Sequence, residues 1–82
     1  MNPIHLAAQM MGKRKIRRRA TAKREQNTVF IWELDDGNAL ELVRKDKGFV
    51  SVVERTEGFD ALVEYYSRSN AHVFSPNNVS AA

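Results

Sequence analysis

The sequence contains no cysteine, only two prolines and four glycines, and no apolar run near the roughly 20 residues that a transmembrane helix needs. Without cysteine, disulfides, cysteine zinc sites, iron–sulfur clusters and cysteine nucleophiles are excluded, in keeping with a reducing compartment. The weakly apolar stretch from Ile4 to Met11 precedes the basic run, which is the reverse of a secretory signal. We therefore expect a cytoplasmic protein that contacts no membrane.

A recognisable catalytic arrangement is also missing. The four glycines are dispersed along the chain, so they form no phosphate-binding loop. His5 and His72 are far apart in the sequence, and neither belongs to a constellation of Ser, Asp and Glu that would suggest a catalytic site. A chain of 82 residues has a small core that encloses a substrate pocket with difficulty. We expect no enzymatic activity, no cofactor and no bound metal.

Charge is distributed unequally along the chain. Residues 1–24 carry eight Lys or Arg and no acidic residue, whereas residues 25–82 carry five basic and ten acidic residues. Clustered basic side chains contact phosphates by releasing counterions, which gives salt-sensitive and largely sequence-independent affinity. We predict a nucleic-acid-binding arm, for DNA or RNA, whose phosphate ligands are Lys13, Arg14, Lys15, Arg17, Arg18, Arg19, Lys23 and Arg24. Because the run contains no aromatic residue for base stacking and no Asn or Gln well inside it for reading base edges, specific readout is not expected from it.

The N-terminal segment has the pattern of a short helix. Asn2 is a competent N-cap, Pro3 suits the first helical position, and Ile4, Ala7 and Met11 share one face. Residues 13–24 have no apolar face to bury, and their like charges repel one another. This part is therefore expected to be an arm that becomes ordered on binding.

The middle of the chain predicts three antiparallel strands. Val29–Leu34 is rich in β-branched and aromatic residues, and Asp35-Asp36-Gly37-Asn38 is a strong turn signal. Ala39–Lys45 returns as a second strand, and a turn at Asp46–Gly48 leads into a third at Phe49–Glu54. These spacings predict a three-stranded meander.

A C-terminal helix is predicted to cover one face of this sheet. After Gly58, Phe59, Leu62, Val63 and Tyr66 recur at helical spacing. The expected fold is thus an α+β domain made of an N-terminal helix with a basic arm at 1–26, a β-β-β-α unit at 27–72 and a flexible tail at 73–82. The predicted core is Phe30, Trp32, Leu34, Leu40, Leu42, Val50, Val52, Phe59, Leu62, Val63 and Tyr66.

Three aromatic residues of the predicted strands have two interpretations. Phe30, Trp32 and Phe49 would form a platform for bases if they lay on an open sheet face, as in sheet-based RNA binders. The alternative is that they fill the core beneath the C-terminal helix. Because a chain this short has few large residues for its core, we favour the core interpretation.

A second class of function remains open. Acidic residues of the second half, with Asp60, Glu64 and Tyr65 on the C-terminal helix, would suit a protein-binding adaptor or inhibitor. A homodimer surface, or a structural component of a larger particle with a threading basic arm, is also compatible with the pattern.

Two resemblances bear on these alternatives. Residues 42–66, with a Gly-Phe-led strand and a helix that ends in Leu-Val-Glu-Tyr-Tyr, resemble the second half of an SH2 domain. Glu33 occupies the place of the arginine that binds phosphotyrosine there, so phosphotyrosine binding is not implied. The expected order of elements is similar to that of small phage head-completion proteins, which is compatible with a phage-encoded protein.

Overall fold

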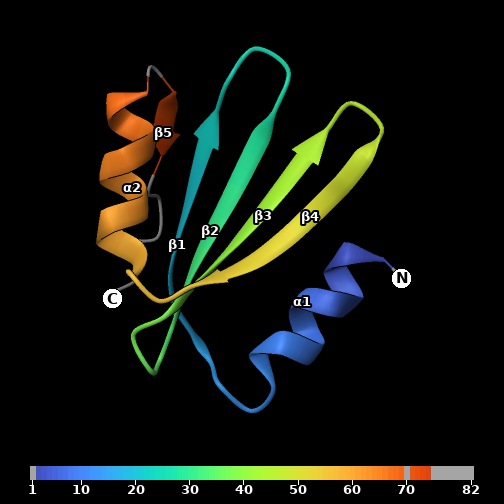
Figure 1. Ribbon diagram of the computed structural model, residues 1–82, viewed down its shortest axis with the longest axis vertical. Coiled ribbons are helices and arrows are strands. Elements are labelled where there is room, and N and C mark those ends of the chain that lie inside the picture. Colours follow the sequence, from blue (N-terminus) through green and yellow to red (C-terminus); the bar gives the residue numbers. More distant parts are fainter. Residues whose placement is uncertain (1, 70, 75–82) are drawn as a thin grey trace.

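The described part of the protein forms one five-stranded antiparallel sheet with a helix on each face. The structure, a computed structural model, describes residues 2–69 and 71–74. Its elements are α1 (Pro3–Met11), β1 (Ile16–Lys23), β2 (Thr28–Leu34), β3 (Ala39–Lys45), β4 (Gly48–Arg55), α2 (Phe59–Arg68) and β5 (His72–Phe74). The strand order is β4-β3-β2-β1-β5, so α2 carries the chain from the β4 edge to the β1 side (Figure 1).

The predicted three-stranded meander with a basic arm is wrong, because the sheet has two further strands. Residues 16–23 of the expected arm form β1, which pairs with β2 on one side and with β5 on the other. The repulsion that argued against order is relieved in two ways. Successive side chains of a strand alternate between the two faces, and two of the arginines are neutralised by carboxylates from other elements.

The two helices pack on opposite faces and cover different strands. On one face, Phe59, Leu62 and Tyr66 of α2 pack on small and branched residues of β1 and β2, such as Ala20 and Ile31. On the other face, Ala7, Met10 and Met11 of α1 pack on a cluster that includes Leu34, Leu40 and Leu42. Since α1 lies mainly over β4 and β3, it leaves β1 and β2 largely uncovered on its own side (Figure 1).

The face assignment corrects the predicted core. Phe30, Trp32 and Leu34 do not lie beneath α2, because α2 packs on the alternate residues Val29 and Ile31. The predicted core residues that are buried are Leu34, Leu40, Leu42, Phe59, Leu62 and Tyr66. Those that are half-buried are Phe30, Trp32, Val52 and Val63. Val50 is 53% exposed, while the small residues Ala7, Ala20, Ala22 and Ala39 are buried without having been predicted.

Local sequence signals placed the turns and caps correctly. The side chain of Asn2 accepts a hydrogen bond from Ile4 N at 2.8 Å, and Pro3 begins α1. Gly12 ends this helix with φ +62°, a conformation that glycine adopts without a steric penalty. The hairpin between β2 and β3 turns at Gly37, as predicted.

The C-terminal expectation is tested only at its start. Val73 and Phe74, assigned to a flexible tail, belong to β5, and Val73 packs on the core beneath α2. Residues 75–82 of the expected tail lie outside the described residues. Neither α1 nor α2, the helices of the described chain, is long and apolar enough to cross a membrane.

Candidate nucleic-acid interface

Strand alternation divides the eight basic residues that the sequence grouped together. Arg19 pairs with Trp32, and Lys23 with Thr28, which places both cations on the α1 side of the sheet. Arg18 pairs with Glu33 on the α2 side. The exposed Arg17 lies at an irregularity in the pairing of β1 with β2, and Lys13 and Lys15 lie exposed in the connection from α1 to β1.

Arg18 and Arg24 are directed toward α2. Arg18 Nε donates to Glu33 Oε1 at 2.7 Å, its Nη2 lies 3.3 Å from Asp60 Oδ2, and its guanidinium stands 4.4 Å above the Phe59 ring. The hydrogen bond from Arg18 lowers the pKa of Glu33. The Arg24 guanidinium lies 5.2 Å from the Tyr66 ring. Arg18 is therefore a residue that ties β1, β2 and α2 together.

Arg14 has a structural role at the opposite end of the sheet. Its Nη1 lies 2.7 Å from Glu54 Oε2 and 2.9 Å from Asp36 Oδ2, and its guanidinium also donates to the carbonyls of Met10 and Met11. It satisfies the free carbonyls at the end of α1 while joining them to β4 and to the β2–β3 turn. Hydrogen bonds from Arg14, and then from Asn38, lower the pKa of Glu54 to about 2.

The α1 side of the sheet carries a surface that we call the basic–aromatic face. Cross-strand pairing orders it in three rows, which run across β5, β1, β2 and β3. Side chains directly opposite each other in neighbouring strands are close enough to act as a unit. The rows are His72, Lys23, Thr28 and Arg44; then Phe74, Thr21 and Phe30; then Arg19 and Trp32.

Aromatic rings and cations lie side by side on this face. The Arg44 guanidinium is 5.3 Å from the Phe30 ring and 6.0 Å from the Phe49 ring, and the two rings are 5.7 Å apart. At the β5 edge the His72 and Phe74 rings are 4.4 Å apart, and Phe74 is 44% exposed. Phe30, Trp32 and Phe49 were interpreted as core, and they do contact it, but they remain half-buried at its margin.

The basic–aromatic face contains no acidic residue. Among the strands that the structure describes, the only carboxylate that continues its rows is Glu54 on β4, opposite Leu40, and Arg14 is bound to that carboxylate. Within residues 2–69 and 71–74, Arg19, Lys23 and Arg44 make no ion pair. Their charges are therefore available to an external anion.

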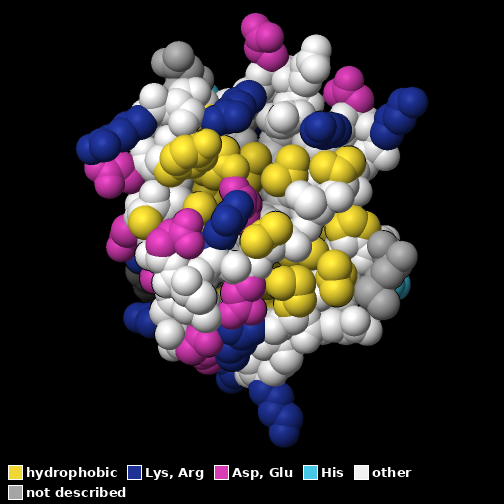
Figure 2. Space-filling view, viewed as in Figure 1, with side chains coloured by type: hydrophobic (Ala, Val, Ile, Leu, Met, Phe, Trp, Pro, Cys, Tyr) yellow, Lys and Arg dark blue, Asp and Glu magenta, His cyan; other side chains and the backbone are white. Residues whose placement is uncertain are grey.

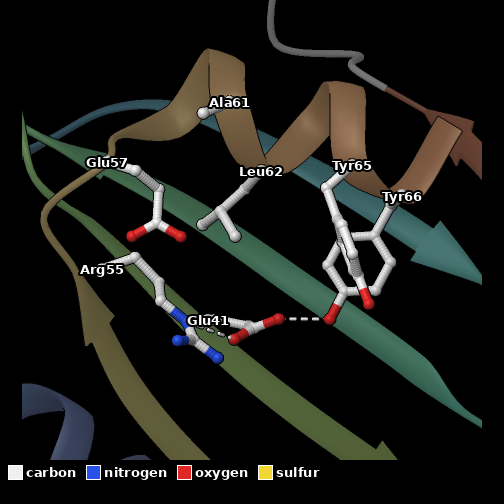
Figure 3. A pocket seen from close by; sticks show the side chains of 7 residues that line it. All are labelled: Glu41, Arg55, Glu57, Ala61, Leu62, Tyr65 and Tyr66. Carbon is white, nitrogen blue, oxygen red and sulfur yellow. Dashed lines mark hydrogen bonds and ion pairs between the residues drawn. The ribbon is translucent and has the colours of Figure 1, made fainter. Parts of the chain in front are cut away.

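The opposite face holds a pocket of about 270 Å³ between α2, β3 and β4. At its base the buried Glu41 accepts hydrogen bonds from Arg55 Nε at 2.9 Å and from the Tyr66 hydroxyl (Figure 3). Burial first, and then the bond to Glu41, raises the pKa of Tyr66, so its phenol stays protonated. The polar atoms at the base thus satisfy one another, which gives this network a structural role.

The residues of the alternative partner surface are on the outer side of α2. Asp60 approaches Arg18, and Glu64 pairs with Arg68 at 2.8 Å one turn later. Tyr65 is 58% exposed and lines the pocket. Figure 2 shows charged side chains of both signs mixed on this view, with hydrophobic side chains gathered across the upper half and over α1.

Sequence reasoning missed the basic and aromatic side chains of Arg44, His72 and Phe74 on the basic–aromatic face, and also its two threonines, Thr21 and Thr28. The three-residue strand β5 is too short to give a pattern, and Arg44 became significant only through its pairing with Thr28. A signal for β1 was present in Ile-Arg-Arg-Arg-Ala-Thr-Ala-Lys, where the buried Ala20 and Ala22 alternate with Arg19, Thr21 and Lys23. The high density of basic residues favoured the interpretation as an arm, so this alternation was not recognised as a strand pattern.

Comparisons with models of protein families, with curated proteins and with solved structures gave no match for this chain.

Proposed function

We propose that this protein is a small non-enzymatic nucleic-acid-binding protein, and that its basic–aromatic face is the binding surface. The observation that carries the proposal is the presence of Arg19, Lys23 and Arg44 on one sheet face, without a carboxylate partner among the described residues. A cytoplasmic location accompanies the proposal, in line with the lack of cysteine.

The mechanism is phosphate neutralisation by a rigid array instead of a flexible arm. Arg19 and Lys23 are four residues apart on one strand, which separates them by about 13 Å along the sheet. Arg44, two strands away, widens the positive surface. Because these side chains project from a paired sheet, less conformational entropy is lost on binding than for a disordered basic tail. Each phosphate contact adds to the salt dependence of the affinity.

The test compares two double variants that remove the same charge. Arg19→Gln with Lys23→Gln removes two cations from the basic–aromatic face, and Lys45→Gln with Arg68→Gln removes two exposed cations elsewhere. We expect the first variant to weaken binding to a labelled oligonucleotide about tenfold or more and to flatten the salt dependence by about two phosphate contacts.

The control variant should change affinity only slightly, in proportion to the lost net charge. Circular dichroism should show both variants folded, since the four side chains are exposed. Equal loss of affinity in the two variants would mean that binding depends on net charge alone, and would overturn the assignment to this face. Unchanged affinity in the Arg19 and Lys23 variant would overturn it as well.

A second candidate function is that of a protein-binding adaptor. It is favoured by the exposed large hydrophobic residues Val50, Val53 and Tyr65, of which the two valines lie on the edge strand β4. Exposed edge strands with apolar side chains are templates for pairing with another chain. Val53→Lys should then reduce capture of a protein partner, or of a second copy of the chain, without affecting oligonucleotide binding.

A further inference from the structure

The geometry of the basic–aromatic face points to a ligand that is single-stranded, with unpaired bases stacked on Trp32 and Phe30 and phosphates held by Arg19, Lys23 and Arg44. This inference rests on the proposed nucleic-acid-binding function and specifies its substrate class. Within it, DNA and RNA share the relevant chemistry, which is a π face on every base and a charge on every phosphate.

Cations and rings are interleaved on this face in a regular way. Arg19 lies directly opposite Trp32, and Thr21 lies directly opposite Phe30 in the next row. The next row again has a cation, Lys23, beside Thr28. A nucleic-acid strand that lies along β1 would therefore contact a positive side chain at each end of β1 and aromatic rings along one side. That combination of a basic track and a stacking platform is what single-strand binders use.

Small side chains keep the middle of the face low. Thr21 stands between Phe30 on β2 and Phe74 on β5, one strand spacing from each, so the backbone positions of the two phenylalanines are about 10 Å apart across the sheet. Thr28 similarly separates Lys23 from Arg44. A planar base can approach the rings over the threonines, whereas long side chains at these positions would fill the space.

The Phe30 and Trp32 rings are only partly buried, which suits a stacking platform better than a purely structural role in the core. Phe30 and Trp32 contact the cluster beneath α1 with part of their surface, which fixes their orientation. They stay half-buried because α1 packs over β4 and β3 and leaves the same face of β1 and β2 largely uncovered. The Arg44 guanidinium lies 5.3 Å from the Phe30 ring. From this position it can stack on the outer side of a base, or it can move aside so that a base stacks on Phe30 directly.

A duplex fits this face less well. In duplex DNA or RNA the base faces are stacked on one another, so flat rings on a sheet have no base to contact. Duplex binding would use Arg19, Lys23 and Arg44 alone. The difference in affinity between the two ligands therefore depends on the aromatic residues, which stack on bases only in a single strand.

Trp32 is the one tryptophan of the chain, so its fluorescence reports directly on the proposed stacking site. The full chain would be titrated at low salt with oligothymidine, oligouridine, a duplex hairpin and inorganic polyphosphate. We expect the two single strands to quench the emission. Polyphosphate and the duplex should compete for the cations but leave the emission nearly unchanged.

Two variants complete the test. Trp32→Leu should lower single-strand affinity about tenfold and leave duplex affinity within about twofold, whereas Trp32→Phe should keep most of the single-strand affinity. Since a change at Trp32 also touches the core, Phe74→Ala at the sheet edge serves as an independent variant, because Phe74 is 44% exposed and lies across Thr21 from Phe30. It should weaken binding of single strands more than binding of the duplex.

The possible failures are distinct. Equal affinity for duplex and single strand, with unquenched Trp32 emission, would overturn the stacking inference while leaving phosphate binding in place. Absence of binding to every probe at low salt would overturn both this inference and the proposed function. Quenching by polyphosphate equal to that by oligothymidine would overturn the stacking inference alone, because polyphosphate has no base to stack.

Discussion

Arg18 and Arg19 are consecutive residues whose side chains lie on opposite faces of the sheet. Arg18 Nε donates to Glu33 Oε1 at 2.7 Å on the α2 side, whereas Arg19 lies opposite Trp32 on the α1 side. The same residue type thus has a carboxylate partner within the chain at one position and, among the described residues, none at the next. This relationship gives the first prediction.

Arg18→Gln should lower stability and spare binding. The Arg18–Glu33 pair has two hydrogen bonds, and the Glu33 side chain is 13% exposed. Replacement of Arg18 therefore leaves the largely buried Glu33 carboxylate without its cation. Because Arg18 itself is partly solvated, we expect a loss of about 1 kcal/mol in the free energy of unfolding. Urea denaturation measures this, and Arg19→Gln is the matched control, with little change in stability. A larger stability loss at Arg19 than at Arg18 would contradict the assigned faces.

Stability should fall as the pH is lowered from about 4.5 to about 2. Arg14 lowers the pKa of Glu54 from 4.5 to about 2 in the folded state, so the stabilising charge is fully present above the unfolded value and is lost as Glu54 becomes protonated. The pKa of Glu33 is lowered as well, and its contribution is lost in the same direction. Thermal unfolding across this range measures the effect. In Glu54→Gln the decline should be shallower, and an identical slope would contradict the role of Glu54.

Tyr66→Phe should destabilise the protein through Glu41. The Tyr66 hydroxyl donates to Glu41, which is 5% exposed and has Arg55 as its other side-chain partner. Removal of the hydroxyl leaves a buried carboxylate oxygen without its donor, at a cost of about 1–3 kcal/mol. Tyr65→Phe is the control, because Tyr65 is exposed and its loss should change stability by about 0.5 kcal/mol or less. Equal midpoints for the two variants in urea would refute the prediction.

Gly58→Ala should be more harmful than Gly12→Ala. Gly58 has φ +93°, and a Cβ built there would lie 3.3 Å from the carbonyl oxygen of Gly37. Backbone strain and this contact together should cost about 1–3 kcal/mol. Gly12, with φ +62°, has open space around the same position, so only the backbone penalty applies. Melting temperatures of the two variants decide the point, and a smaller decrease for Gly58→Ala would be the contrary result.

The predicted strands at 29–34, 39–45 and 49–54 agree with β2, β3 and β4, because each pattern is local and ends at a turn residue such as Gly37 or Gly48. The strand β1 was missed although its alternation is present in the sequence. Its stability as a strand depends on partners distant in sequence: Glu33 for Arg18, α2 for Ala20 and Ala22, and β5 at its outer side.

Local chemistry by itself determined the caps, the turns, the amphipathic stripe of α2 and the excess of positive charge near the N-terminus. Only the tertiary structure decided which basic side chains remain available, because cross-strand pairing sends Arg18 to Glu33 and Arg19 to the open face. It likewise decided that Trp32 borders an open face, since that depends on where α1 packs. Propensity and capping act over a few neighbouring residues, whereas a sheet face is assembled from segments distant in the sequence, such as Thr21 and Phe74, which are 53 residues apart.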